Sequence, residues 1–225
     1  LEIEEAARQA ADLSQKMLAY AGKGWFSWRG FTLTKVVEDL HVTLKKLIPK
    51  NVRLHLQLAE NSPQVLGDPC QCSQVIMYLT ANAIEAIHGG PGTISIRTGA
   101  INCDHSYLAG AYGGQFLPDG AYAYVEVKDT GCGIPEEALD RIFEPFYSLD
   151  FSRRGMGLAA VAGIARTHRG AIRIETSQGR GTTVRVLFPV HAVKTSSSTD
   201  DSWQGRGTVL VAESKKPVRK TTRAT

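Results

Sequence analysis

A helix predicted over residues 69–88 carries the first residue that could do chemistry, Asn82. At 100° per residue, Val75, Ile76, Leu79, Ala83, Ala86 and Ile87 share one side of this helix. Asn82 lies at the border of that apolar face, where an amide oxygen can point into a cleft. Mg²⁺ prefers oxygen ligands, so the amide suits that cation. Taken alone, a polar stripe opposite a core stripe usually indicates only a solvated face.

A second candidate is Asp129, which ends the apolar run 121–128 and is followed by Gly131 and Gly133. Two glycines two residues apart permit a tight turn and a close approach of the backbone to a ligand. A carboxylate at the end of a strand can accept a hydrogen bond from an exocyclic amine such as that of adenine. The alternative is an ordinary turn that uses Asp for its turn chemistry.

Gly155 and Gly157 form the third candidate, because they directly precede a helix predicted over 157–168. Glycines there expose backbone N–H groups and the positive end of the helix dipole, an arrangement that binds phosphate. A single Gly-x-Gly before a helix is weak support. Together, in this order along the chain, the three candidates carry more weight than any of them does alone.

The elements that must position these residues follow from hydrophobic periodicity and breakers. We predict an α/β (α+β) two-layer sandwich, in which an approximately five-stranded mixed sheet carries three main helices on one face. The predicted helices are 34–47, 69–88 and 157–168, and the predicted strands are 52–58, 93–98, 121–128, 171–176 and 182–188.

The flanks read differently from this central domain. Residues 1–22 show apolar residues at alternating steps of three and four, which predicts one bundle helix that needs a partner helix. Residues 24–34 and the Ser-, Thr-, Asp- and Gly-rich stretch 191–206 are predicted linkers, and a last short strand is predicted at 208–212.

Composition excludes several classes. The net charge of +4 is mild, and no basic stripe with interleaved aromatics occurs, so we expect no nucleic-acid partner. The four cysteines match no disulfide framework or zinc site, which favours free thiols in a reducing, cytoplasmic compartment. No apolar run reaches the roughly 20 residues of a membrane span. Whether a longer parent protein is membrane-anchored stays open.

The ordered motifs give a resemblance to a known family. Residues from about 68 to 190 resemble the ATP-binding domain of sensor histidine kinases, within the group that includes gyrase, Hsp90 and MutL. The matching stretches are Gln74–Ile87 (N box), Asp129–Ile134 (first glycine box), Ile142–Tyr147 (F box), Gly155–Leu158 (second glycine box) and Gly179–Val184.

The resemblance implies ATP and Mg²⁺ as cofactors. Asn82 would hold the metal, Asp129 would read the adenine amine, and Phe143 and Phe146 would anchor the loop over the nucleotide, with Ser148–Arg154 as the ATP lid. The full set of implied nucleotide-binding residues is Asn82, Glu85, Asp129, Gly131, Gly133, Ile134, Phe143, Phe146, Arg154, Gly155, Met156, Gly157, Leu158 and Thr182.

The resemblance also implies a domain plan. Residues 1–23 resemble the second helix of the dimerisation and phosphoacceptor hairpin, 24–190 the ATP-binding catalytic domain, 191–206 a linker, and 207–225 the start of a receiver domain. The γ-phosphoryl would go to a histidine outside this chain, and no catalytic residue is assigned within it. The implied partners are that hairpin and a receiver, from the same parent or another protein, and the full-length parent would be a homodimer.

Departures from the family pattern leave an alternative. Tyr78 stands where the family usually has a first asparagine, and Asp150 stands where it usually has a lysine. A carboxylate near the polyphosphate repels it. These positions favour a nucleotide-binding pseudokinase with a regulatory role, whereas the intact glycine boxes, Asp129 and Asn82 favour an active kinase. A gyrase- or MutL-like ATPase is disfavoured by the helix at 1–22 and the receiver-like end.

Overall fold

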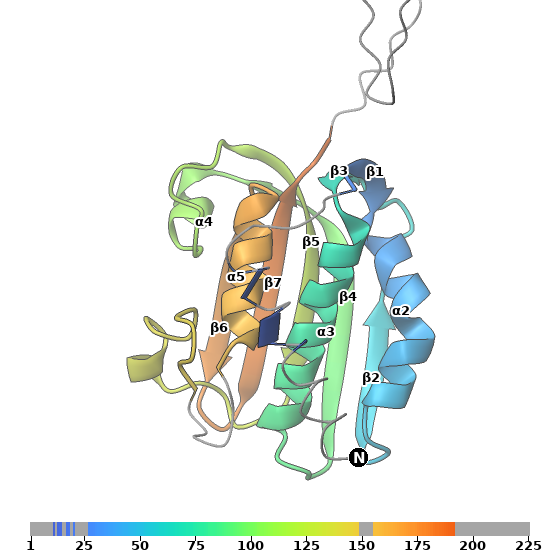
Figure 1. Cartoon of the computed structure of the whole chain (residues 1–225), viewed down its shortest axis with the longest axis vertical. Helices are drawn as coiled ribbons and strands as arrows, with labels where there is room; N and C mark the ends of the chain where they lie inside the picture. Colours follow the sequence, from blue (N-terminus) through green and yellow to red (C-terminus); the bar gives the residue numbers. More distant parts are fainter. Residues whose placement is uncertain are drawn as a thin grey trace, which may run out of the picture. The chain divides into compact units, whose positions relative to one another are not determined.

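The central sheet has five strands in the order β2-β4-β5-β7-β6 (Figure 1). In this computed structural model, the described residues are 27–148 and 155–191, together with positions 11, 13, 14, 17, 18 and 20. The strands are β2 (Val52–Gln57), β4 (Gly92–Cys103), β5 (Gly120–Asp129), β6 (Ala171–Ser177) and β7 (Gly181–Pro189). Only β2 and β4 are parallel, so the sheet is mixed, as predicted.

Three helices cover one face of this sheet: α2 (Leu33–Leu47), α3 (Pro69–Ala86) and α5 (Gly157–Thr167) (Figure 1). Helix α3 lies between the other two and packs against both. It begins where predicted, because the Asp68 side chain accepts a hydrogen bond from Cys70 N at 2.8 Å and Pro69 occupies the first turn. The predicted two-layer sandwich with three helices on one face is confirmed.

A small second sheet was not predicted. Strands β1 (Arg29–Thr32) and β3 (Gln64–Gly67) pair antiparallel. The assignment of 24–34 as a linker was therefore wrong over 29–32, because a four-residue strand is too short to show a period-two pattern. The domain begins with β1, which pairs with β3, and it also ends beside β3. At that end, Val190 forms a β-bridge with Val65, and His191 N donates to Gln64 O at 2.8 Å.

A second departure lies between β4 and β5. The predicted strand 93–98 continues to Cys103, and the short helix α4 (His105–Ala109) follows. Residues 104–119, here called the β4–β5 insertion, pack on the sheet face opposite the long helices. Leu108 there is fully buried with Tyr122 and Leu187. The periodicity analysis missed α4 because five residues are too few to reveal a helical period.

The flanking predictions lie largely outside the described residues. The described positions between 11 and 20 are helical, in agreement with a helix at 1–22. Residues 192–225, which include most of the predicted linker and the receiver-like segment, are outside the described part. The described residues all fall within one compact unit, residues 1–192. Within the described part, no helix is both long and apolar enough to cross a membrane.

Candidate nucleotide site

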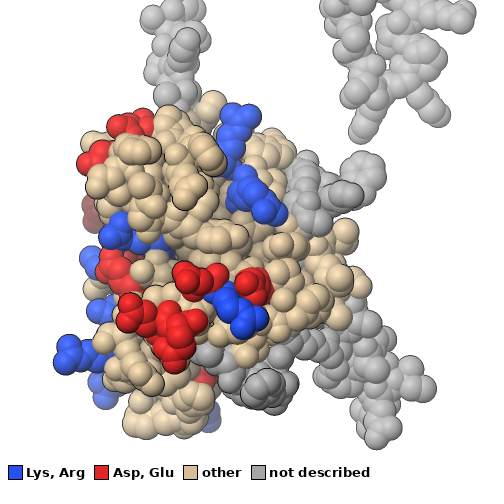
Figure 2. All heavy atoms as spheres, turned by 90° about the vertical axis from the view of Figure 1, so that its left-hand side faces the viewer, with Lys and Arg blue, Asp and Glu red and all other residues tan. Residues whose placement is uncertain are grey.

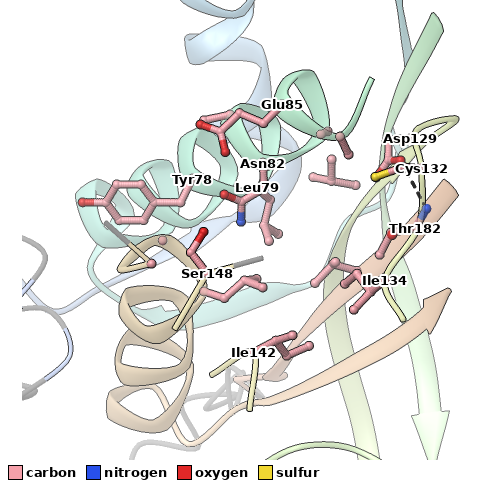
Figure 3. A pocket seen from close by; sticks show the side chains of 18 of the residues that line it. Tyr78, Leu79, Asn82, Glu85, Asp129, Cys132, Ile134, Ile142, Ser148 and Thr182 are labelled. Carbon is pink, nitrogen blue, oxygen red and sulfur yellow. Dashed lines mark hydrogen bonds between the residues drawn. The ribbon is translucent and has the colours of Figure 1, made fainter. Parts of the chain in front are cut away.

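A cavity of about 310 Å³ lies between α3, the N-terminus of α5 and the ends of β5 and β7 (Figure 3). Its volume falls in the usual range for small-molecule sites. The lining residues come from five stretches of the chain, within residues 78–88, 127–134, 142–148, 155–158 and 182–184. They are Tyr78, Leu79, Ala81–Ala83, Glu85, Ala86, His88, Val127, Asp129, Cys132–Ile134, Ile142, Tyr147, Ser148, Gly155–Leu158, Thr182 and Val184.

Asp129 is a buried carboxylate at the end of β5, with 6% of its surface exposed. Its Oδ1 accepts hydrogen bonds from Gly131 N at 2.7 Å and from Thr182 N at 3.2 Å. In the described residues, Oδ2 has no hydrogen-bond partner. One oxygen is therefore fixed by the protein, and the carboxylate borders the cavity (Figure 3).

The backbone around Asp129 needs glycine at specific places. Gly181 has a φ of +91°, and a Cβ on it would collide with the carbonyl oxygen of Asp129. Gly131 lies against α3, since its Cβ would be 2.6 Å from Ala86. The Gly179–Val184 stretch thus brings the amide of Thr182 within hydrogen-bond distance of the carboxylate.

Burial raises the pKa of the Asp129 carboxyl, because removal from water disfavours the charged form. The two backbone N–H donors act in the opposite direction and lower it, but burial is the larger effect. A donor that approached the carboxylate from the cavity would stabilise its charge further. The site is therefore built to accept a hydrogen bond from a ligand.

The N-terminus of α5 borders the other end of the cavity. Met156 occupies the N-cap position, and its side chain makes no capping hydrogen bond. The first N–H groups of a helix have no partner within the helix, so an uncapped N-terminus of this kind attracts an anion. Gly157 lies beside Asn82, since a Cβ on Gly157 would be 3.1 Å from Asn82 Oδ1. An amide oxygen and an anion-binding helix end therefore adjoin.

Apolar side chains form the walls between these two ends. They are Leu79, Ala83, Val127, Ile134, Ile142 and Val184. Such walls suit a flat, weakly polar ring rather than a sugar or a peptide backbone. Among the described residues, no Lys or Arg lines the cavity.

Most of the predicted site residues lie together in this cavity. Those that line it are Asn82, Glu85, Asp129, Gly133, Ile134, Gly155, Met156, Gly157, Leu158 and Thr182. Arg154 and the rest of the lid segment up to it lie outside the described residues, apart from Ser148. Gly131 lies behind the site. Phe143 is buried beside the cavity without lining it, and Phe146 is 61% exposed and points elsewhere.

Sequence reasoning did not assign several lining residues. Leu79 and Ala83 were assigned to the core face of α3, and they are also the part of that face that reaches the cavity. Ile142 and Tyr147 belong to the F-box stretch, in which only Phe143 and Phe146 were predicted to be site residues. The periodicity of an irregular loop gives no signal that would separate a lining aromatic from a supporting one.

The cysteines and the possible metal ligands form no second site in the described part of the chain. All four cysteines are free, as expected. In the described part of the chain, no cluster of three or more His, Cys, Asp or Glu side chains could hold a metal by itself.

Comparison with known proteins agrees with this geometry. The profile of the family described as histidine kinase-, DNA gyrase B-, and HSP90-like ATPase matches residues 67–192. The sensor kinase CckA of Brucella abortus is 31% identical over 97% of this chain and 24% of that protein. The sensory histidine kinase/phosphatase NtrB of Rhodobacter capsulatus is 41% identical over 57% of this chain and 34% of that protein.

The solved catalytic domain of histidine kinase ThkA superposes with a TM-score of 0.58 at 25% identity, over 73% of this chain and 96% of that one. This chain therefore spans about a quarter to a third of the two curated relatives and nearly all of an isolated catalytic domain. The family match over residues 67–192 spans all the described residues that line the cavity. The chain belongs to the histidine kinase-, DNA gyrase B- and HSP90-like ATPase family, as a catalytic domain of the sensor histidine kinase type.

Proposed function

We propose that this chain is the ATP-binding catalytic region of a two-component sensor histidine kinase and delivers the γ-phosphoryl of ATP to a histidine outside the chain. The observation that carries the proposal is the cavity with a fixed, buried carboxylate at one end and an uncapped helix N-terminus at the other. The similarity to two sensor kinases supports it.

Asp129 would recognise the base. Its Oδ1 is already held by two backbone N–H groups, so Oδ2 would accept a hydrogen bond from the exocyclic amine of adenine. The apolar side chains of Leu79, Ile134 and Val184 would cover the faces of the ring. Because the carboxylate cannot donate, a base with a carbonyl at the same position would be rejected.

The N-terminus of α5 would receive the phosphates. The backbone N–H groups that follow Gly155 would donate to phosphate oxygens, and the helix dipole favours their negative charge. Phosphoryl transfer depends mainly on such positioning and charge stabilisation. The bond from the γ-phosphorus to the oxygen of ADP would break as an imidazole nitrogen of the acceptor forms its own bond to phosphorus.

The donor set fits Mg²⁺. Asn82 offers an amide oxygen and Glu85, one turn further along α3, a carboxylate, and both border the cavity (Figure 3). Mg²⁺ takes one or two protein oxygens together with phosphate oxygens and water. With no described Lys or Arg lining the cavity, a bound Mg²⁺ would supply the positive charge that shields the phosphates. Asn82 would hold the ion, and the lack of a side chain on Gly157 leaves room for its amide.

The phosphoacceptor would lie outside the chain. The six histidines of this sequence are His41, His55, His88, His105, His168 and His191, and none falls within residues 1–23. We propose that residues 1–23 complete a dimerisation hairpin, that 24–190 are the catalytic domain, that 191–206 are a linker and that 207–225 begin a receiver. The partners would then be a phosphoacceptor hairpin and a receiver, in a homodimeric parent.

The pseudokinase alternative rests on Tyr78 and Asp150. Tyr78 borders the cavity at the position where the family usually has a first asparagine. Asp150 lies outside the described residues. The named relatives are sensor kinases and give the alternative no support.

Transfer from labelled ATP to a supplied phosphoacceptor hairpin decides between the two functions. We expect a labelled histidine on the hairpin and tight, Mg²⁺-dependent ATP binding by calorimetry. Tight binding with no transfer to any hairpin tested would reject the kinase and favour the pseudokinase. Steady release of inorganic phosphate without an acceptor would instead indicate an ATPase.

A further inference from the structure

Residues 142–148, here called the aromatic wall, form one side of the cavity through Ile142, Tyr147 and Ser148. The segment that leads into it is amphipathic. Ala138, Ile142 and Phe143 are buried, whereas the neighbouring charged side chains face solvent. The exposed charged residues of this segment are Glu136, Glu137, Asp140, Arg141 and Glu144. Figure 2 shows acidic side chains gathered around a basic one on the side of the molecule that faces left in Figure 1.

The aromatic wall has no regular helix or strand of its own. Arg141 lies over the ring of Tyr147 at 4.4 Å and donates to Glu144 at 3.1 Å. The amide of Phe146 donates to Gly155 O at 3.0 Å, and Gly155 itself lines the cavity. Both residues have positive φ, +67° and +58°. The position of the aromatic wall is thus linked directly to the glycines before α5.

The support for the aromatic wall from outside comes from the β4–β5 insertion. Tyr112 stacks on Phe143 with ring centroids 4.1 Å apart and an interplanar angle of 29°. Tyr112 is itself fixed to edge strand β6, because its N–H donates to Ile172 O at 2.8 Å and its carbonyl accepts from Ile172 N at 3.0 Å. The Tyr112 side chain is nevertheless 47% exposed, so it is not a core residue.

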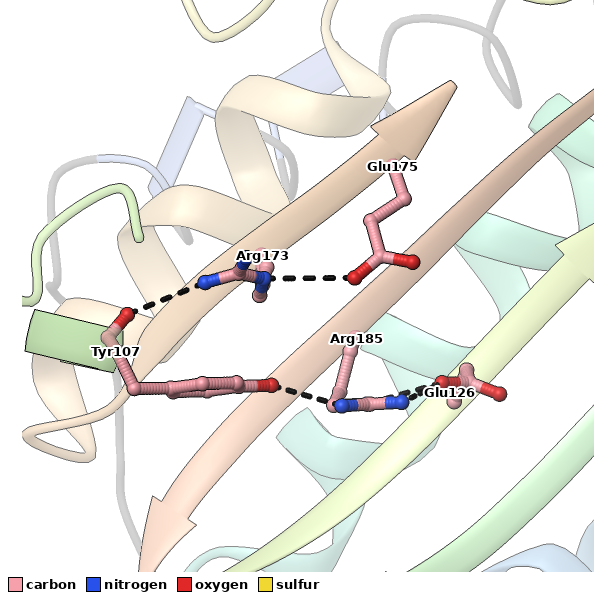
Figure 4. A network of polar contacts seen from close by, with 5 residues as sticks. All are labelled: Tyr107, Glu126, Arg173, Glu175 and Arg185. Atoms are coloured by element: carbon pink, nitrogen blue, oxygen red, sulfur yellow. Dashed lines mark hydrogen bonds and ion pairs between the residues drawn. The ribbon is translucent and has the colours of Figure 1, made fainter. Parts of the chain in front are cut away.

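The insertion is anchored at its other end by a polar network on the open face of the sheet (Figure 4). The hydroxyl of Tyr107, on α4, accepts from Arg185 at 2.7 Å, and Arg185 pairs with the buried carboxylate of Glu126. Arg173 lies over the Tyr107 ring at 4.5 Å. Arg173 and Arg185 are opposite one another on neighbouring strands, where like charges repel, and Tyr107 engages both.

We propose that Tyr112 is a positioning residue for the nucleotide site, which holds Phe143 and thereby places the aromatic wall against the bound nucleotide. The inference rests on the proposed function, since it assigns a support to the same cavity. Tyr112 lines no part of the cavity and would act only through Phe143. The route runs from β6 to Tyr112 and through the ring stack to Phe143 in the aromatic wall, whose Phe146 amide is bonded to Gly155.

The test compares Tyr112→Ala, which removes the stacked ring, with Tyr112→Phe, which keeps it. Phe116→Ala is the matched control, because Phe116 lies in the same insertion and is 95% exposed. On the full chain, Mg-ATP affinity is measured by calorimetry and backbone protection by hydrogen exchange. We expect Tyr112→Ala to weaken Mg-ATP about fivefold, the size that an aromatic pair contributes, with native affinity in Tyr112→Phe and Phe116→Ala.

Hydrogen exchange gives a readout that a purely structural role would not produce. In Tyr112→Ala the amide of Phe146 should exchange faster, whereas the amides of β5 and β7 should keep their protection. Native protection at Phe146, or equal effects of the Ala and Phe variants, would overturn the role of Tyr112. Should Tyr112→Ala fail to fold, Tyr112→Leu makes the same comparison. Failure of the unsubstituted chain to bind Mg-ATP would overturn the proposed function, while the exchange result would still report on the support.

Discussion

At the scale of single residues, the site depends on Asp129, of which only Oδ2 is left to accept a hydrogen bond from a ligand. Two backbone donors already occupy Oδ1, and burial raises the pKa of the carboxyl. A buried carboxylate oxygen that lacks a donor destabilises the ligand-free protein, and a ligand that supplies a donor removes this cost. The selectivity for the base should therefore reside in this one side chain.

Inosine triphosphate tests that selectivity, because a carbonyl oxygen replaces the amine of adenine. We expect the native chain to prefer ATP over ITP on the order of tenfold to a hundredfold, the range for a hydrogen bond to a charged group. Asp129→Asn should lose most of this preference, since an amide can also donate. Calorimetry of both nucleotides with both proteins measures it, and an unchanged preference in the variant would remove Asp129 from base recognition.

Gly179 and Gly181, at the turn between β6 and β7, allow the effect of backbone strain to be distinguished from that of steric collision. Gly179 and Gly181 both have positive φ, but only a Cβ on Gly181 meets another atom within 4 Å, the carbonyl of Asp129 among them. We expect Gly179→Ala to destabilise the fold by about 1 kcal/mol and Gly181→Ala by about 2 kcal/mol or more. Urea unfolding measures both. Equal losses would show that φ alone matters here.

At the scale of elements, His168 joins the two helices that border the cavity. It follows α5, and its Nε2 accepts a hydrogen bond at 3.0 Å from the backbone N–H of Asp68, the N-cap of α3. Its Nδ1 lies 2.9 Å from Ile164 O, so that nitrogen carries the proton. Trp28 stacks on the ring at 5.4 Å, which brings the chain entry to the same point. Both nitrogens are engaged, so the neutral form is required.

This contact predicts a pH dependence of stability. Burial lowers the pKa of His168, so below about pH 6.5 the unfolded chain binds a proton that the folded chain does not. The stabilisation is present above that pH and is lost as the pH falls, by up to about 1.4 kcal/mol per pH unit. Urea unfolding at pH 7.5 and 5.5 should show a smaller drop in His168→Gln than in the native chain.

The exposed His55 on β2 supplies the matched control for that experiment. His55→Gln should retain the full native drop between the two pH values. The same drop in all three proteins would mean that another group controls the acid stability. Asp68 is the titratable side chain nearest to the ring, and its charge opposes the effect of burial.

Sequence reasoning identified the elements that carry a long periodic pattern and missed those that do not. Helix α3 was placed within two residues, because its cap, proline and apolar stripe agree. Strand β1 and helix α4 were missed, because they have too few residues for a period to show. Asn82 and Asp129 were recognisable from residue type and spacing. The stack of Tyr112 on Phe143 was not, since no local pattern relates residues that meet only through tertiary packing.

At the scale of the whole molecule, the cavity draws on α3, β5, α5 and β7, all within the compact unit 1–192. We therefore expect a chain that ends at Ala192 to bind ADP as tightly as the full chain. ADP at about 100 times its Kd should raise the unfolding free energy by about 2.7 kcal/mol in both. Calorimetry and thermal unfolding check this, and a weaker affinity in the shorter chain would show that residues beyond 192 contribute to the site.

The N-terminal strand β1 and the C-terminal end of the described domain both contact strand β3. Thr32 pairs with Gln64 from one side, and His191 donates to the same residue from the other. The residues of α3 that line the cavity, between Tyr78 and Ala86, lie in the other half of that helix. A circular permutant that joins these two points through a short Gly-Ser bridge, and opens new termini at the turn that contains the exposed Gly89, should retain the native topology. Joined to another protein through its native ends at β3 instead, the catalytic domain would be a self-contained unit whose nucleotide cavity faces away from the host.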